Sequence, residues 1–241
     1  MKKFYPVIHC HDIKSTIENT QMCLDANTDG LFLINHGEIS DSQFREHIEK
    51  VQNYCTKYTG EFKIGVNFLN LSNISALKEV SKFGLNMLWV DNAECDDVLN
   101  LEEVTKFWFQ MIKCDPESKI DIFGGVHFKY QEKPKSSIED SIKSCVYNTM
   151  YPTLSGPATG KPADLNFIQR AYDHVVLCRK DNAEQYCNLA IASGISIENV
   201  DQYIPYIEYF LVASSLLAVD QIDFDNQKLK TLSQKIHNEQ T

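Results

Sequence analysis

Basic residues are scarce and scattered in this sequence. The 241-residue chain has 33 acidic side chains against 23 Lys and Arg, which gives a formal net charge of -10, and no run of Lys or Arg exceeds two residues. A surface with that excess of negative charge repels polyanions. The composition therefore argues against nucleic acids and anionic membranes as main partners.

Long apolar stretches are also missing. Residues 1–12 include two lysines, but their short apolar stretch is interrupted by Pro6 and by histidines, so it lacks the apolar centre of a signal peptide. The longest apolar stretch, residues 210–219, contains two serines and falls well short of the ~20 residues that a membrane-spanning helix needs. We expect a soluble, cytoplasmic protein.

The cysteines lack the spacing of a metal clip or a redox pair. None of the eight belongs to a C-x-x-C pair, and in a reducing compartment such scattered cysteines are usually buried as small apolar residues. No linker, low-complexity tract or shift in composition divides the chain either. We therefore predict one domain over residues 1–241.

Short apolar runs of strand length recur eight times along the chain. Most lack the alternation of polar and apolar residues found in a sheet with one exposed face, which indicates strands covered on both faces, as in a parallel sheet. The runs are residues 5–9, 30–34, 63–69, 86–90, 120–128, 150–155, 189–193 and 209–214.

Amphipathic helical patterns lie between these runs. Residues 40–58 place Phe44, Ile48, Val51 and Cys55 at spacings of four, three and four, which makes one apolar stripe. Eight strand–helix pairs in a chain of this length match a single (β/α)8 barrel, the TIM barrel of the α/β class. The alternative is an open doubly wound sheet, whose dinucleotide-binding form needs glycines after the first strand, where residues 9–15 have none. Similar helical patterns occupy residues 101–112, 137–147 and 225–238.

Polar side chains follow nearly every apolar run. The carboxyl ends of barrel strands share one mouth, where barrel enzymes hold their substrates, so we expect these side chains to gather there. The alternative is the ordinary polarity of turns. The predicted substrate-binding residues are Asn35, His36, Asn67 and Asn92, together with Ser155, Gly156, Thr159, Gly160 and Lys161 after the sixth run.

Three residues at strand ends are candidates for catalysis. His127 and Lys129 are two residues apart, so on a strand they would project the same way, beside Gly124 and Gly125, which permit close backbone approach. A lysine at the inner rim of a barrel needs a counter-charge or an anionic ligand. Asp91 directly follows the fourth run and is a candidate general base or hydroxyl acceptor. The alternatives for Asp91 are a helix cap and an ion pair with Lys129.

The segment 153–165, TLSGPATGKPADL, contains residues typical of phosphate-binding loops. It is not a P-loop, because only three residues separate Gly156 from Gly160 and Pro162 stands where the magnesium-binding hydroxyl belongs. An anion can still bind here, since a helix beginning near Asp164 presents free backbone N–H groups.

A second candidate anion site follows the last two runs. Small residues after the seventh and eighth strands are where barrels commonly cradle a phosphate with backbone N–H groups. The alternative is plain turn chemistry. The predicted phosphate-binding residues are Ser193, Gly194, Ser214 and Ser215.

Several of these segments are similar to those of BtpA-like proteins, TIM barrels sometimes labelled phosphoribosyltransferases. The resemblance implies the barrel and a phosphate-type ligand, and it runs from about residue 5 to residue 220. The first run departs from the family because it lacks the proline-rich loop of many members, and residues 176–187 look like an insertion. The segments that carry the resemblance are SGPATGKPADL (155–165), ASGISIENVDQYI (192–204), FLVASSL (210–216), DGLFLINHGEIS (29–40), IGVNFLN (64–70), LWVDNAE (88–94) and FGGVHFKYQ (123–131).

Three classes of function remain open at this point. The leading one is an enzyme acting on a phosphorylated sugar or ribosyl compound, by phosphoribosyl or glycosyl transfer or by acid–base chemistry, in which Asp91 or His127 moves a proton and Lys129 stabilises charge. The second is a divalent-metal hydrolase of the amidohydrolase type, because His9 and His11 form an H-x-H pair on the first run. The third is a non-catalytic barrel that binds a metabolite or supports assembly of another complex.

Cofactors and assembly are less clearly indicated. No motif predicts an organic cofactor, and a divalent metal belongs only to the second class of function. Barrels often form homo-oligomers, and no stripe in the sequence identifies an interface.

Overall fold

The computed structural model of the chain describes residues 1–96, 120–180 and 187–238. The helix predicted over residues 101–112 lies outside these ranges. None of the helices in the described ranges combines the length and the hydropathy of a membrane-spanning segment.

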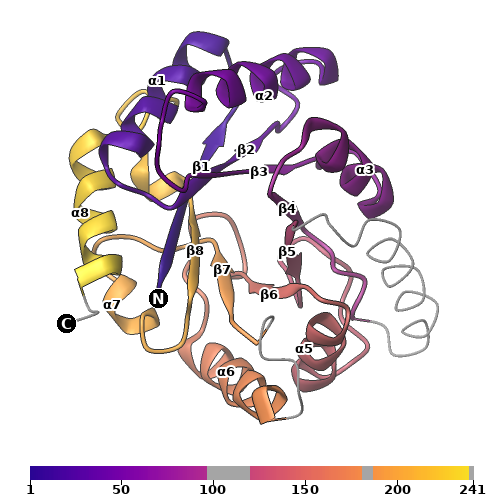
Figure 1. Ribbon diagram of the computed structural model, residues 1–241. Helices are drawn as coiled ribbons and strands as arrows, with labels where there is room; N and C mark the ends of the chain where they lie inside the picture. The colour runs from indigo at the N-terminus through magenta and orange to yellow at the C-terminus, as the bar shows by residue number, and fades with distance from the viewer. Residues whose placement is uncertain (97–119, 181–186, 239–241) are drawn as a thin grey trace.

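Eight parallel strands close into a barrel in chain order, each pairing with the next and the last with the first (Figure 1). Every apolar run singled out in the sequence forms one of these strands, which confirms the predicted (β/α)8 barrel and excludes the open sheet. The strands are β1 (Lys3–His9), β2 (Gly30–Ile34), β3 (Lys63–Asn67), β4 (Met87–Val90), β5 (Asp121–Gly125), β6 (Tyr151–Leu154), β7 (Ala190–Ala192) and β8 (Tyr209–Val212).

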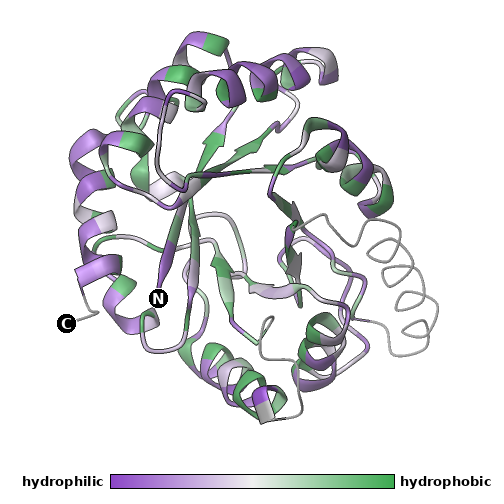
Figure 2. Cartoon of the chain, viewed as in Figure 1, coloured by the Kyte–Doolittle hydropathy of each residue, from purple (hydrophilic) through white to green (hydrophobic). Residues whose placement is uncertain are grey.

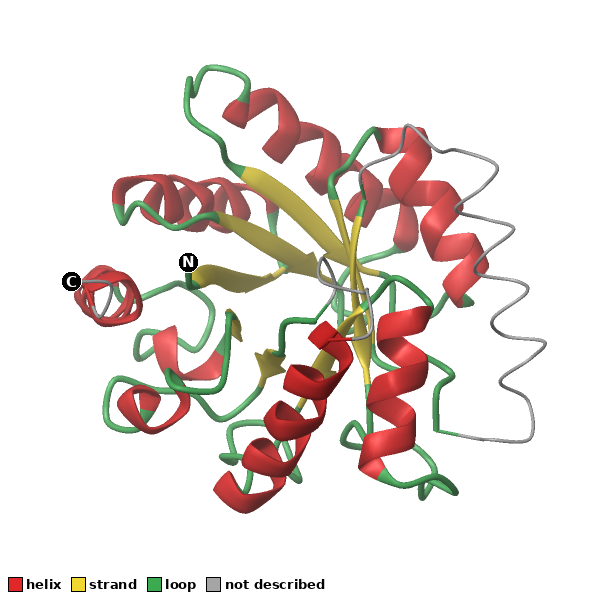
Figure 3. Ribbon diagram, turned by 60° about the horizontal axis from the view of Figure 1, so that its bottom comes forward, coloured by secondary structure: helices red, strands yellow, loops and turns green. Residues whose placement is uncertain are grey.

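Helices alternate with the strands and form an outer layer around the barrel (Figures 1 and 3). The helices predicted over residues 40–58, 137–147 and 225–238 correspond to α2, α5 and α8. The described helices are α1 (Ile13–Asp25), α2 (Asp41–Cys55), α3 (Asn73–Phe83), α5 (Ile138–Tyr147), α6 (Leu165–Lys180), α7 (Val200–Tyr203) and α8 (Asn226–Asn238), with a short 3-10 helix, η2 (Ser214–Leu216).

Several helices begin directly after a residue whose side chain caps the helix. The cap fixes the residue at which the preceding loop ends and the helix begins. Ser40 precedes α2 and forms a capping box with Gln43, and Asp12 precedes α1 and accepts from the backbone N–H of Ser15. Such caps contribute about 1 kcal/mol each. The loops after β1 and β2 are short, whereas those after β5, β6 and β8 are longer and supply much of the surface at the carboxyl ends of the strands.

The strands are predominantly hydrophobic, whereas the helices carry both apolar and polar residues (Figure 2). Aromatic rings fill the inside of the barrel, where Tyr5, Phe32 and Phe123 meet edge to face with ring centroids 5.4–5.9 Å apart. A separate apolar layer packs between the strands and the helices. The barrel interior is thus a packed core rather than a pore.

Charged side chains lie at the amino ends of the strands. Asp29, which precedes β2, pairs with Lys3 of β1 at 2.7 Å and with His237 of α8 at 2.9 Å. Lys63 of β3 pairs with Asp121 of β5. These ion pairs lie at the amino ends of the strands. The candidate site predicted from the sequence lies at the other end of the barrel, at the carboxyl ends of the strands.

Candidate functional site

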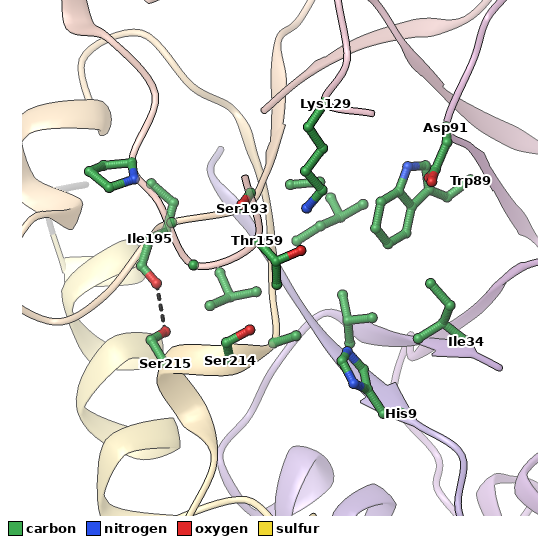
Figure 4. Close-up of a pocket in the computed structure, with 18 of the residues that line it drawn as sticks. His9, Ile34, Trp89, Asp91, Lys129, Thr159, Ser193, Ile195, Ser214 and Ser215 are labelled. Carbon is green, nitrogen blue, oxygen red and sulfur yellow. Dashed lines mark hydrogen bonds between the residues drawn. The ribbon is translucent and has the colours of Figure 1, made fainter. Parts of the chain in front are cut away.

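A pocket of about 700 Å³ lies at the carboxyl ends of the strands, within the size range of small-molecule sites. Its lining comes from strands and loops spread over the chain from Val7 to Ser215, as Figure 4 shows for part of it. The residues from the sequence prediction that line it are His9, His36, Asp91, Lys129, Thr159, Gly160, Ser193, Gly194, Ser214 and Ser215. The structure brings these residues to one cavity, and their contacts with a ligand stay predictions.

Other predicted substrate-binding residues serve the turns instead. The Asn35 side chain donates to the carbonyl of Ile39 at 2.7 Å and accepts from the Gly37 N–H, and the Asn92 side chain accepts from the Glu94 N–H. These residues do not line the main pocket, and turn polarity accounts for them. The predicted residues outside its lining are Asn35, Asn67, Asn92, Ser155, Gly156, Lys161, His127 and His11.

His127 lies away from the pocket. Its Nε2 atom is 3.2 Å from Ser141 Oγ on α5, its ring stacks on that of Phe167 in α6, and its backbone N–H donates to Asp96. The imidazole therefore contacts the helical layer and does not line the pocket.

The prediction that His127 and Lys129 project the same way is wrong. Strand β5 ends at Gly125, so the two residues belong to the following turn. His127 and Tyr130 have φ values of 47° and 63°, which break the two-residue alternation that holds only along a strand.

Lys129 lies in the pocket without a counter-charge. Among the described residues no carboxylate oxygen comes within 4.0 Å of its ammonium group, so the alternative of an ion pair with Asp91 is not formed. Burial lowers the pKa of Lys129, and the nearby charge of Asp91 partly opposes this. The Lys129 backbone is fixed by its N–H, which donates to Ser155 Oγ at 2.9 Å.

Asp91 follows β4 and faces the same cavity. Burial raises the pKa of its carboxyl group, while a hydrogen bond from Asn67, 2.8 Å from Nδ2 to Oδ1, and the charge of Lys129 act in the opposite direction. A Cβ atom on Gly125 would lie 2.0 Å from the Asp91 carbonyl oxygen, so the close approach expected of that glycine is present. Asn67, whose contact with a substrate stays a prediction, donates a hydrogen bond to the carboxylate of Asp91.

Two imidazoles adjoin at the ends of β1 and β2. The ring centroids of His9 and His36 are 4.7 Å apart. Burial, followed by the charges of His36, His11 and Lys129, lowers the pKa of His9 to about 4, and burial also lowers the pKa of His36. His9 is therefore neutral at pH 7 and offers a ring nitrogen as a hydrogen-bond acceptor.

The H-x-H pair does not form a metal centre in the described part of the chain. His9 lines the pocket and His11 does not. Within residues 1–96, 120–180 and 187–238 no group of three or more His, Cys, Asp or Glu side chains is placed to hold a metal ion. The arrangement gives the amidohydrolase-like interpretation no support.

The loops after β6 and β7 pack directly on each other. Ser193 Oγ donates to the carbonyl of Ala158 at 3.1 Å. Gly194 has a φ of 70°, and a Cβ atom there would lie 2.2 Å from the carbonyl oxygen of Lys161. Only glycine allows this approach, which fixes the position of the β7 loop at the pocket wall.

The loops after β7 and β8 line the same side of the pocket and, among the described residues, carry backbone N–H groups without an acceptor. Ser215 Oγ donates to the carbonyl of Ile195 at 2.6 Å, the dashed line in Figure 4, which ties the loop after β8 to the loop after β7. Within the described residues, the backbone N–H groups of Gly194, Ile195, Ser214 and Ser215 donate to no other group. Such a group of unused N–H donors suits an anion.

Trp89 and Tyr130 are among the pocket residues that the sequence interpretation missed. Trp89 lines the pocket and is held edge to face against Phe32 and Phe128, with both pairs of ring centroids 6.1 Å apart. Tyr130 stands at the rim, where its hydroxyl accepts from the Thr159 N–H at 3.1 Å. Trp89 precedes Asp91 by two residues. Because alternate residues of a strand project to the same face, this spacing could have predicted that both side chains line the pocket.

Comparisons with known proteins establish the fold. No protein-family model matches the sequence, and no curated protein does. Phosphoribosyl anthranilate isomerase from Thermotoga maritima matches with a TM-score of 0.64 at 15% identity, over 99% of this chain and 100% of that chain. Phosphoribosyl anthranilate isomerase from Thermus thermophilus matches with a TM-score of 0.63 at 12% identity, over 99% of this chain and 100% of that chain. A tryptophan synthase structure from Mycobacterium tuberculosis matches with a TM-score of 0.63 at 10% identity, over 98% of this chain and 92% of that chain. Likeness at this level of identity extends to the barrel and not to the activity.

Proposed function

We propose that this protein is an enzyme that acts on a small phosphorylated substrate, a sugar phosphate or ribosyl phosphate, bound in the mouth of the barrel. The observation that carries the proposal is Lys129, a half-buried cation that lines the pocket with no carboxylate within 4.0 Å among the described residues. Apart from the Phe128 ring, 5.5 Å from its ammonium group, Lys129 has no close counter-charge, and an anionic ligand would lower the cost of burying its charge.

The phosphate is held at the ends of β7 and β8. Backbone N–H groups of Gly194, Ser214 and Ser215 bind its oxygens, and the Ser214 hydroxyl adds a donor. Barrels commonly bind phosphate at these two strand ends. The similar structures named as phosphoribosyl anthranilate isomerases support a phosphorylated substrate for this chain as well.

Asp91 is the proton-transferring group of this proposal. Burial raises its pKa toward the range in which a carboxylate accepts a proton efficiently. Lys129 faces the same cavity and stabilises the negative charge that develops on the substrate when the proton leaves. Acid–base chemistry is the form of the reaction that this pair supports best, ahead of phosphoribosyl or glycosyl transfer.

The family assignment is also a proposal. The resemblance to BtpA-like proteins is supported by segments 155–165 and 192–204, which supply pocket-lining residues after β6 and β7. Membership would make the mouth of the barrel the common site of that family.

Ligand-induced stabilisation tests the proposed function. We expect ribose 5-phosphate at millimolar concentration to raise the Tm of the protein, because a ligand that binds only the folded state stabilises it by mass action. The variant Lys129→Met should lose this increase. The matched control Lys133→Met, which removes a charge from an exposed residue outside the pocket, should keep it. An unchanged Tm with both ribose 5-phosphate and phosphoribosyl pyrophosphate, or an equal increase in Lys129→Met, would contradict the proposal.

A further inference from the structure

Ionisable side chains occupy one part of the pocket wall. Four of them, contributed by the ends of β1, β2 and β4 and by the loop after β5, are His9, His36, Asp91 and Lys129. Among the lining residues that the structure describes, those from the loops after β7 and β8 are uncharged. A substrate whose phosphate lies at β7 and β8 therefore turns its remaining atoms toward these four side chains.

The ring nitrogens of His9 have no role in holding the fold together. Among the described residues neither nitrogen forms a hydrogen bond or an ion pair, and both remain accessible to solvent. By contrast, His47 bonds Thr16 with 3.0 Å between Nδ1 and Oγ1, and His237 bonds Asp29 with 2.9 Å between Nε2 and Oδ2. The fold uses those two imidazoles, whereas both nitrogens of His9 are available to a ligand in the pocket.

The position of the His9 ring is nevertheless restrained. His9 pairs with Ile34 in the register between β1 and β2, so its backbone is part of the sheet. The ring of His36 lies against it, with the centroids 4.7 Å apart and the planes inclined at 58°. Figure 4 shows His9 and Lys129 extending into the same cavity. A side chain restrained in this way loses little entropy when it contacts a bound substrate.

A neutral imidazole can give and take a proton at the same time. Burial lowers the pKa of His9 to about 4, so at pH 7 one ring nitrogen carries a hydrogen and the other accepts one. Two neighbouring oxygens of a substrate can therefore exchange a proton through this ring. Burial raises the pKa of Asp91, which suits its carboxylate to accept a proton from carbon. The two groups thus suit two different proton transfers.

Isomerisation of a compound with a hydroxyl next to its carbonyl needs both transfers. Asp91 takes the proton from the hydroxyl-bearing carbon, the C–H electron pair forms a C=C bond, and the carbonyl electron pair moves to its oxygen, where Lys129 stabilises the charge. His9 gives a proton to this oxygen and takes one from the neighbouring hydroxyl. The second oxygen then becomes the carbonyl, and the C=C electron pair takes the proton from Asp91 at the other carbon. All atoms and electrons stay in the substrate, so no co-reactant is consumed.

We propose that His9 is a second catalytic residue, which relays a proton between two neighbouring oxygens, and that the substrate is a sugar phosphate interconverted between its aldose and ketose forms. This inference rests on the proposed function, because it takes the phosphate site and the roles of Asp91 and Lys129 from it. It adds the kind of reaction and the carbonyl–hydroxyl pair that a substrate must carry.

Proton NMR of ribose 5-phosphate in D₂O tests the inference by following two events separately. The first is exchange of the hydrogen on the carbon next to the aldehyde, which reports proton removal by Asp91. The second is formation of the ketose, which also needs the transfer between oxygens. We expect both events with the wild-type protein and neither with Asp91→Asn.

His9→Gln separates the two events. Glutamine keeps a polar side chain but cannot relay a proton, so ketose formation should slow by about 100-fold or more. Hydrogen exchange should slow much less, and the ratio of exchange to ketose formation should therefore rise. The matched control is His174→Gln on α6, outside the pocket lining, which should keep both rates. Urea unfolding at pH 7.5 verifies that each variant is folded.

The outcomes distinguish this inference from the proposed function. If ribose 5-phosphate raises the Tm of the wild type but shows neither exchange nor ketose formation, the isomerisation is overturned while the phosphate site stands. If folded His9→Gln slows both events by the same factor, or leaves both unchanged, the proton relay by His9 is overturned. If ribose 5-phosphate neither raises the Tm nor reacts, the phosphate site fails and the isomerisation fails with it.

Discussion

At the scale of single residues, burial shifts the pKa values of the ionisable groups at the mouth of the barrel. Asp91 and Lys129 could be identified from the sequence because each is a charged residue directly after an apolar run. Trp89 was missed because an aromatic residue inside such a run is usually core. His127 was misplaced because the alternation of a strand was extended past Gly125, where the strand ends.

The pKa of His9, lowered to about 4, predicts a pH dependence of stability. The unfolded chain binds a proton at this histidine near pH 6.5 and the folded chain does not, so this contribution to stability is complete above pH 6.5 and decreases as the pH falls toward 4. The free energy of unfolding should fall between pH 7.5 and pH 5 in the wild type. In His9→Gln this decrease should be smaller by about 1–2 kcal/mol, because the variant lacks the shifted histidine.

Urea unfolding at the two pH values measures this effect. The control is His174→Gln, which alters a histidine of α6 outside the pocket lining. A His9→Gln variant whose pH dependence equals that of the wild type would show that His9 titrates normally in the folded protein.

At the scale of the element, the strands were predictable and the loops were not. Strands of a closed parallel barrel are buried on both faces, so each appears in the sequence as a continuous apolar run. A loop takes its path from contacts with other loops, such as Ser215 with Ile195 and Gly194 with Lys161, and these partners are far apart in the chain. Asn35 and Asn92 form hydrogen bonds within turns, which the sequence did not indicate, and their contacts with a ligand stay predictions.

The packing of the β6 and β7 loops predicts unequal effects of two similar glycine substitutions. Gly194 and Gly160 have φ values of 70° and 71°, so alanine is strained at both by about 1 kcal/mol. At Gly194 the added Cβ also meets the Lys161 backbone at 2.2 Å, whereas at Gly160 it meets nothing within 4 Å. Gly194→Ala should cost about 1–3 kcal/mol more than Gly160→Ala.

The free energies of unfolding of the two alanine variants check this difference. Gly194→Ala should also reduce the affinity for inorganic phosphate, because the loop that carries the N–H donors must move. Equal stabilities of the two variants would mean that the loops do not pack as described.

At the scale of the whole molecule, the two ends of the barrel have separate roles. Among the described residues, the mouth holds Lys129 and Asp91 without a salt bridge, whereas the charged groups at the amino end form ion pairs. Asp29 joins β1, the start of β2 and α8 through Lys3 and His237. This division agrees with the general observation that barrels place chemistry at the carboxyl ends of the strands and stability at the other end.

The paired end predicts an acid-sensitive contribution to stability. Burial alone would raise the pKa of Asp29, but hydrogen bonds from His237, Lys3 and the Phe4 N–H lower it overall. A carboxylate with a lowered pKa stabilises the fold above about pH 3.9 and loses this effect as the pH falls through the folded-state value. Asp29→Asn should therefore be less stable than the wild type at pH 7.

The difference between Asp29→Asn and the wild type should shrink below about pH 4. Thermal unfolding across this range measures it, with the exposed Asp25→Asn as the control. A constant difference at all pH values would assign the loss to packing rather than to the ionised carboxylate.

The account depends on one ligand site formed by residues that are distant in the sequence. A crystal structure of the protein grown with ribose 5-phosphate tests it most directly. We predict phosphate density against the backbone N–H groups of Gly194, Ser214 and Ser215, with Lys129 and Asp91 facing the same molecule. Ligand density bound elsewhere, or Asp91, Lys129 and Ser214 opening onto different surfaces, would contradict it.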